Sequence, residues 1–241
     1  MQFLRRVIGL EENAAQVEGK LTAPAHVWCV AVQGDTLHAG CADGTVSSWK
    51  LSGATTSQLG TTKRAHEGTV YALCAWPLTV VSAGADGYVR LWHAGQDGTL
   101  QEGVQLECSG GVESPGRPIL SLALDAAVLS EFFSGGVDRC IRRWTRGSGE
   151  WRVSHVADAA HAKEVFALVL CGAAGGAAGG AAGGVALLAS AGGDGTVRLW
   201  WGADLAPLAT LGGAELGRAV FALCACGGAE VDNTTLLAGG H

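Results

Sequence analysis

The sequence lacks the features that mark membrane and secreted proteins. No run approaches the roughly 18 consecutive apolar residues that a membrane helix needs, so we expect no membrane insertion. The N-terminal apolar residues are interrupted by Arg5 and Arg6, unlike the continuous apolar core of a secretory signal. Eight cysteines without such a signal favour a reducing compartment. We therefore predict an intracellular protein, cytoplasmic or nuclear.

Basic charge is scarce as well. The 241 residues include 16 Lys and Arg against 22 Asp and Glu, which gives a formal net charge of −6. Basic doublets such as Arg142-Arg143 are too few to form a basic stripe, so we expect no nucleic-acid partner. Proline is also rare, with 5 residues beside 38 glycines, which indicates many tight turns. The hydrophobic fraction of 48% is ample for a large core.

One motif recurs along the chain: an Asp followed six residues later by a Trp. The four copies are Asp43 and Trp49, Asp86 and Trp92, Asp138 and Trp144, and Asp194 and Trp200. Successive Trp residues are 43, 52 and 56 positions apart. Four copies in register indicate that one supersecondary unit is repeated.

A short apolar segment accompanies each copy of this motif. It occurs upstream of each Asp and once more after the last Trp, at residues 27–31, 70–74, 119–123, 165–169 and 220–224. These segments are apolar on both alternating faces, which is typical of strands that are covered on both sides. Each repeat also contains a strand just before the Asp, a strand that leads to the Trp and a more polar strand after the Trp. With the apolar segment as the first strand, each repeat is predicted to form a four-stranded antiparallel sheet. Such sheets must stack on one another to bury their faces.

Together these motifs resemble the WD-repeat family of β-propellers over roughly residues 20–241. The resemblance implies an all-β propeller of four-stranded antiparallel blades, with about four complete blades and a truncated fifth, an incomplete propeller. We expect the propeller to span residues 22–241, in repeats at about 22–64, 65–108, 109–158, 159–213 and, in part, 214–241. The segment 1–21 is either an outer strand or disordered, and the Ala/Gly-rich tract 172–184 is predicted to be a surface loop.

The resemblance also implies a hydrogen-bonded chain of His, Ser, Asp and Trp in each blade. The matching residues are His66, Ser82, Asp86 and Trp92 in the second repeat; His161, Ser190, Asp194 and Trp200 in the fourth; Ser134, Asp138 and Trp144 in the third, with Pro115 in the His position; and Asp43 and Trp49 in the first, with Ala39 in the Ser position. A buried carboxylate is costly unless it is hydrogen-bonded. We therefore interpret these side chains as a structural network.

Ser, His and Asp are also the residues of a hydrolase triad. A nucleophilic Ser must be exposed beside an oxyanion hole, whereas here each Ser is expected in mid-strand and the trio occurs at a structural period. The spacing of His155, Asp158 and His161 could suit a metal, but no further ligand completes a tetrahedral set. We expect no catalytic residues, no metal site and no cofactor.

The aromatic residues fall into two groups. Trp28, Tyr71, Phe166 and Phe221 share one repeat position and are expected to pack between blades. Trp151 and Trp201 lie outside the repeated aromatic positions, which makes them candidates for partner binding, because exposed Trp is a common binding anchor.

The function that the resemblance implies is a non-catalytic scaffold that binds other proteins or peptides. Two alternatives remain open: a propeller enzyme with an active site at the channel mouth, and a truncated fragment without independent function. In the fifth repeat His241 stands where the turn Asp would be. We expect this open last blade to pair with further sequence or with another chain.

Overall fold

The computed structural model of the protein describes residues 21–52, 55–61, 64–95, 97–108, 116–124, 129–173, 186–212, 218–227 and 234–240. Within these ranges every regular element is a β-strand, and no helix there could span a membrane. The expectations for residues 1–20, for Pro115, for residues 174–184 of the predicted loop and for His241 fall outside the described ranges. Residues 172 and 173, which were expected in that loop, belong instead to the strand Val165–Ala173. The chain divides into two compact units, one of residues 1–84 and 90–105 and one of residues 85–89 and 106–241.

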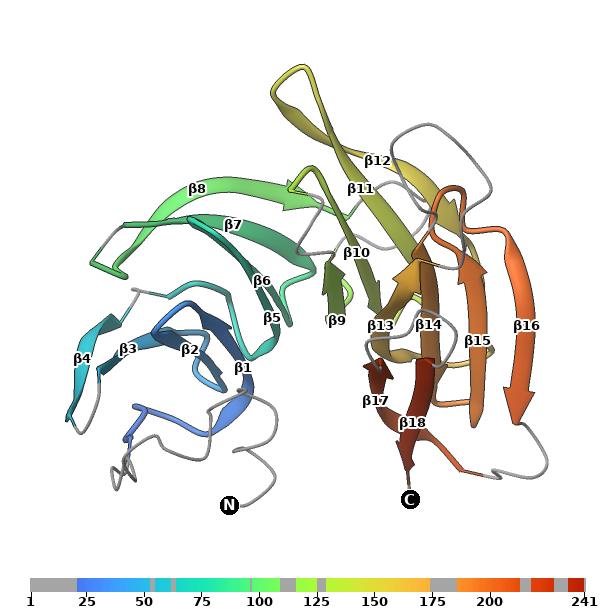
Figure 1. The fold of residues 1–241 in the computed structure, drawn as a ribbon, viewed down its shortest axis with the longest axis horizontal. Coiled ribbons are helices and arrows are strands. Elements are labelled where there is room, and N and C mark those ends of the chain that lie inside the picture. Colours follow the sequence, from blue (N-terminus) through green and yellow to red (C-terminus); the bar gives the residue numbers. More distant parts are fainter. Residues whose placement is uncertain are drawn as a thin grey trace. The chain divides into compact units, whose positions relative to one another are not determined.

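Two four-stranded sheets are built mainly from the first unit (Figure 1). The first sheet has the order β1 (Val27–Gln33), β2 (Thr36–Cys41), β3 (Val46–Ser52) and β4 (Thr55–Thr61). The second has the order β5 (Val70–Trp76), β6 (Thr79–Gly84), β7 (Tyr88–Ala94) and β8 (Leu100–Glu107). Each strand therefore pairs with the strand that follows it in the sequence.

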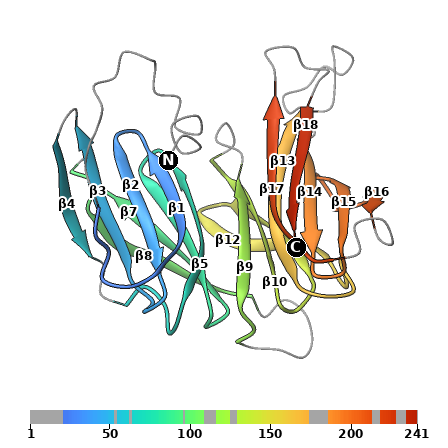
Figure 2. The same cartoon turned by 90° about the horizontal axis from the view of Figure 1, so that it is seen from below.

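The second unit repeats this order in two further complete sheets. They consist of β9 (Ile119–Leu124), β10 (Glu131–Gly136), β11 (Ile141–Gly147) and β12 (Glu150–Ala157), and of β13 (Val165–Ala173), β14 (Ala186–Gly192), β15 (Thr196–Trp201) and β16 (Pro207–Gly212). A fifth sheet has two strands, β17 (Val220–Gly227) and β18 (Thr234–Gly240), and β17 lies beside β13 (Figure 2). The predicted all-β fold, with four complete sheets and a partial fifth, is confirmed.

The turn after each repeated Asp requires a left-handed residue. Gly44, Gly87 and Gly195 follow three of the Asp residues and have φ angles of 86°, 77° and 76°. A Cβ on Gly44 would also collide with the carbonyl oxygen of His66, whose amide donates to Gly44. In the third sheet Arg139 takes the same place at φ 69°. Glycine therefore meets the requirement for a left-handed residue in three of the four turns, without the strain that a side chain brings.

Within each unit, consecutive sheets pack through opposite faces of their first strands. In the first unit, Cys29 and Ala31 of β1 join a cluster with Val70 and Leu73 of β5. In the second unit, Ala123 of β9 and Phe133 of β10 pack with Leu168 of β13, and Ala167 packs with Val220 and Leu223 of β17. Within each unit, one face of a first strand thus contacts the opposite face of the next.

The expected burial of the repeated aromatic residues is wrong for two of the four. Trp28 and Phe221 have 61% and 46% of their surface exposed, whereas Tyr71 and Phe166 are half-buried. Each exposed residue nevertheless contacts an aromatic ring of a neighbouring sheet: Trp28 lies 5.7 Å from Tyr71, and Phe221 lies 4.7 Å from Phe166, between ring centroids. Trp28 belongs to the first sheet and Phe221 to the fifth. Within its unit, each of these sheets packs one face against a neighbouring sheet.

Candidate functional site

A pocket of about 410 Å³ lies in the first unit, lined by the β1–β2 turn and the β5–β6 turn. Its apolar lining includes Val32, Trp76 and Leu78, and its charged lining is Asp35 and Lys50. The Trp76 side chain is buried, whereas Leu78 is 63% exposed. The pocket therefore combines an apolar floor with an apolar side chain that projects into solvent and a pair of charges.

Local hydrogen bonds and backbone geometry hold the two turns in place. The Gln33 side-chain amide donates to the carbonyl oxygen of Trp76 and thereby ties the first turn to the second. Leu78 adopts a φ of 63°, a left-handed conformation that is rare for a residue with a branched bulky side chain. Gly98, at φ 80°, also lines the pocket, and a Cβ there would collide with the Leu59 side chain.

The two charges in the pocket neutralise each other. Lys50 Nζ lies 2.5 Å from Asp35 Oδ1, and the hydrogen bond from Lys50 lowers the pKa of Asp35 below its usual value. Both side chains remain accessible, Asp35 more than Lys50. Because an exposed ion pair contributes little to stability, either charge is available to a ligand at small cost. This arrangement suits binding.

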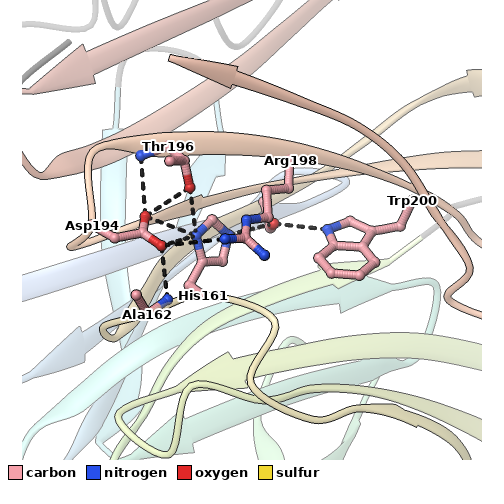
Figure 3. A network of polar contacts seen from close by, with 7 residues as sticks. His161, Ala162, Asp194, Thr196, Arg198 and Trp200 are labelled. Carbon is pink, nitrogen blue, oxygen red and sulfur yellow. Dashed lines mark hydrogen bonds and ion pairs between the residues drawn. The ribbon is translucent and has the colours of Figure 1, made fainter. Parts of the chain in front are cut away.

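The fourth sheet holds a network of polar contacts around His161 (Figure 3). Ser190 Oγ lies 2.7 Å from His161 Nε2 and accepts a 2.8 Å hydrogen bond from Trp200 Nε1. His161 Nδ1 lies 3.0 Å from Asp194 Oδ1. Asp194 also accepts hydrogen bonds from the amides of Ala162 and Thr196 and from the Thr196 hydroxyl. The four sequence-selected residues of this repeat are thus in direct contact.

Burial and hydrogen bonding set the charge states in this network. Desolvation lowers the pKa of His161, against the opposing effect of Asp194, so the imidazole is neutral near pH 7. Desolvation alone would raise the pKa of Asp194, but the hydrogen bonds from Ala162, Thr196 and His161 hold it below its usual value. A neutral His161 can then donate to the ionised Asp194 and accept from the Ser190 hydroxyl. The Ser190 hydroxyl is fully buried, which leaves no access for a substrate.

The second sheet has a related arrangement with an additional arginine. Ser82 Oγ lies 2.7 Å from His66 Nε2 and accepts from Trp92 Nε1 at 2.9 Å. The Arg90 guanidinium donates to His66 Nδ1 at 2.7 Å. Asp86 Oδ1 accepts from the Tyr88 amide at 3.2 Å. The structure therefore brings the His, Ser and Trp of this repeat together and adds Arg90, which sequence reasoning had missed.

In the third sheet an arginine and a cysteine are close to the residues of the network. Trp144 Nε1 donates to Ser134 Oγ at 2.9 Å, and the buried Arg142 donates to Asp138 Oδ2 at 2.5 Å. Desolvation raises the pKa of Cys108 to about 12, against smaller opposing effects of Arg142 and Ser134. The signal for the arginine was in the sequence: Arg also occupies the fourth position after Asp86 and Asp194.

The first sheet uses a histidine that the repeat alignment did not select. His38 is fully buried on β2, and its Nδ1 lies 2.8 Å from Ser48 Oγ. Desolvation lowers the pKa of His38 to about 4. Asp43 accepts from the Thr45 amide and hydroxyl, and Trp49 is buried. Because His38 lies on a strand and not before it, the repeat register gave no signal for its contact with Ser48.

The two tryptophans proposed as partner-binding candidates differ in exposure. Trp201, at the end of β15, is exposed, and its amide donates to the carbonyl oxygen of Ala206. Trp151 on β12 is half-buried and packs against Phe132 at 5.1 Å between ring centroids. Within the described ranges no cluster of three His, Cys, Asp or Glu side chains could hold a metal ion.

Comparison with known families identifies repeats in this chain. Residues 17–50, 57–93 and 182–200 match the family described as WD domain, G-beta repeat. No curated protein matches the sequence.

Two solved structures have a similar fold. The structure of Sqt1 from Saccharomyces cerevisiae matches with a TM-score of 0.67 and 14% sequence identity, over 83% of this chain and 52% of that chain. The computationally designed Ika4 protein matches with a TM-score of 0.54 and 25% identity, over 80% of this chain and 99% of that chain. The present chain thus spans about half the length of Sqt1.

Proposed function

Because this chain is a WD-repeat protein, we propose that it is a non-catalytic scaffold whose Asp35–Leu78 pocket binds a segment of a partner protein. Proteins of this family generally bind other proteins. Repeated sheets supply a rigid support, and the turns between their strands are free to vary, so binding residues on turns are expected.

Leu78 carries this proposal. It is a large apolar side chain, 63% exposed, on a backbone at φ 63°. Exposure and left-handed geometry both cost free energy, and such strain tends to persist where it serves a function. The turn presents Leu78 beside the pocket that is lined by Trp76 and Val32. A partner's apolar side chain can bury Leu78 and fill this pocket at the same time.

The charges beside the pocket indicate which partner residues would fit. Asp35 is the more exposed member of its ion pair with Lys50 and offers a carboxylate to a cation. The net charge of −6 also attracts basic segments. We therefore favour an extended segment with one large apolar side chain next to a Lys or Arg.

The burial of the candidate nucleophiles supports binding over catalysis. Ser82 and Ser190 are fully buried, and both hydroxyls already contact a His and a Trp. Desolvation raises the pKa of Cys29, Cys74 and Cys108 to about 12, so these thiols stay protonated near pH 7. Free thiols also support an intracellular site of action in a reducing compartment, either the cytoplasm or the nucleus. They occur at Cys29, Cys41, Cys74, Cys108, Cys140 and Cys171.

A peptide screen followed by matched substitutions tests this function. Peptides that bind the purified 241-residue protein are selected from a random library, and their affinities for Leu78→Asp and Leu129→Asp are measured by calorimetry. Leu129 is a suitable control because it is also an exposed Leu in a turn between the first two strands of a sheet. We expect Leu78→Asp to weaken binding by about tenfold or more, in the range of an interface hot spot, and Leu129→Asp to leave it unchanged.

Two results would overturn the proposal: equal affinities for both variants, or selected peptides without an apolar residue beside a basic one. Raising the salt concentration should weaken binding, because the Asp35 contribution is electrostatic and exposed.

A further inference from the structure

The residue that begins the first strand is buried at the start of β5, β9, β13 and β17, whereas it is exposed at the start of β1. Val27, which begins β1, is 48% exposed. The Val residues that begin β5, β13 and β17 are buried, and they are Val70, Val165 and Val220. Three residues further along β1, Val30 is also exposed, whereas its equivalents Leu73 and Leu168 are buried. We call Val27 and Val30 the β1 face.

A second repeat position shows the same contrast in the fifth sheet. Leu237 of β18 pairs with Cys224 of β17 and is 55% exposed. The residues at the same place on β6, β10 and β14 are buried, and they are Val81, Phe133 and Ala189. Ala222, two positions before Cys224, is exposed as well. We call Ala222 and Leu237 the β17–β18 face.

Inside each unit these two kinds of face pack on each other. Phe133 and Ala123, which correspond to Leu237 and Cys224, pack with Val165 and Leu168 of the next sheet. Val165 and Leu168 are the equivalents of Val27 and Val30. The two exposed faces are therefore the two halves of one sheet-to-sheet contact.

We propose that a second copy of this chain places its β17–β18 face on the β1 face, so that the protein associates head to tail. Each face then receives the apolar partner that its equivalents have within the chain. The contact is heterologous, because different surfaces of the two copies meet. This association is independent of the peptide pocket at Leu78.

The aromatic rings support this pairing of faces. Trp28 contacts Tyr71 of the next sheet, and Phe166 contacts Phe221 of the next sheet. In a head-to-tail contact Phe221 of one copy approaches Trp28 of the other and continues the same pattern of ring contacts. Aromatic pairs of this kind add specificity to an apolar interface.

The composition of the two faces also suits a second copy as the occupant, because apolar residues of one copy would meet apolar residues of the other. Neither face contains an Asp, Glu, Lys or Arg, whereas each copy carries a net charge of −6. Salt should therefore strengthen the association, since it screens the repulsion between copies and leaves the apolar contact intact.

Complementation between two variants provides the test. The mass of the purified 241-residue protein is measured by light scattering and by sedimentation, alone and with Val30→Asp or Leu237→Asp. We expect the unsubstituted protein to associate and each variant alone to dissociate at least tenfold more readily. An equimolar mixture of the two variants should form a one-to-one complex, because one copy retains its β17–β18 face and the other its β1 face.

Matched controls separate this contact from general stickiness. Val104→Asp and Leu208→Asp change exposed apolar residues on β8 and β16, outside both faces, and should leave association unchanged. Circular dichroism spectra establish that every variant retains its β-structure. A monomeric unsubstituted protein at high salt, variants that still associate, or a mixture that remains monomeric would each overturn the proposal.

Discussion

Replacing Asp194 with Ala should destabilise the fourth sheet by about 2 kcal/mol. The substitution removes the acceptor for His161 Nδ1, for the Ala162 amide and for both donors of Thr196. The exposed Ala162 amide can turn to water, but the fully buried His161 cannot. Thr196 Oγ1, which lies 3.1 Å from His161 Nδ1, remains as an acceptor for this buried donor. The main cost is therefore the loss of the charged acceptor that Asp194 provides to buried His161.

The magnitude follows from that single loss. A buried polar group that loses its partner costs about 1–3 kcal/mol, and lost hydrogen bonds to the amides add to this. For a chain of this size each kcal/mol lowers the melting temperature by roughly 2–4 °C. We expect Asp194→Ala to lower it by about 4–8 °C and Asp194→Asn, which keeps one oxygen acceptor, to lower it by less.

Urea and thermal unfolding, followed by circular dichroism at pH 7, measure this effect. The control is Asp204→Ala, since Asp204 is exposed and accepts only a local hydrogen bond from the Ala206 amide within the described residues. If Asp194→Ala and Asp204→Ala differ by less than about 0.5 kcal/mol, the usual range for surface substitutions, the network does not stabilise the fold.

The network also predicts how acid affects stability. The folded pKa of Asp194 is lowered, so its contribution is complete above the unfolded pKa of about 3.9 and is lost as the pH falls toward the folded pKa. The loss of stability below about pH 4 should accordingly be smaller in Asp194→Asn than in the unsubstituted protein. Equal acid sensitivity of the two proteins would contradict this assignment.

Three further expectations concern other sites. Arg142→Ala should destabilise the protein by about 3 kcal/mol or more, because it leaves Asp138 without its buried partner. Adding Asp138→Ala should recover part of this loss, as measured by urea unfolding in a double-mutant cycle. The pKa of His38 is lowered to about 4 in the folded protein, whereas an unfolded His has a pKa of about 6.5. The free energy of unfolding should therefore fall as the pH drops from 6.5 to 4. His38→Gln should make this pH dependence less steep, and an unchanged pH dependence would contradict the assignment to His38. Leu78→Gly should weaken binding of the selected peptides while changing stability by less than about 1 kcal/mol, because relief of the left-handed strain offsets the added chain entropy; a large loss of stability in thermal unfolding would contradict the strain argument.

The repeat motif predicted local features well because they depend on short-range geometry. An Asp-Gly turn needs a left-handed residue and a donor for the Asp, and both requirements are visible within a few positions, as at Asp194 and Gly195. Arg142 was missed although Arg recurs at the same place in three motifs. An Arg before a Trp on an alternating strand gives no indication of whether it faces solvent or a carboxylate.

The sequence by itself determined the repeated sheets and the strand order within them, since a periodic pattern of apolar and turn residues repeats the same local solution. The contacts among the His, Ser and Trp residues were expected from the resemblance to a known family. Only the tertiary structure decided which faces are covered. Val27 and Val70 occupy the same repeat position, yet Val27 is exposed and Val70 is buried. Burial depends on the neighbour that packs against a face, and that neighbour comes from a distant part of the chain or from another molecule.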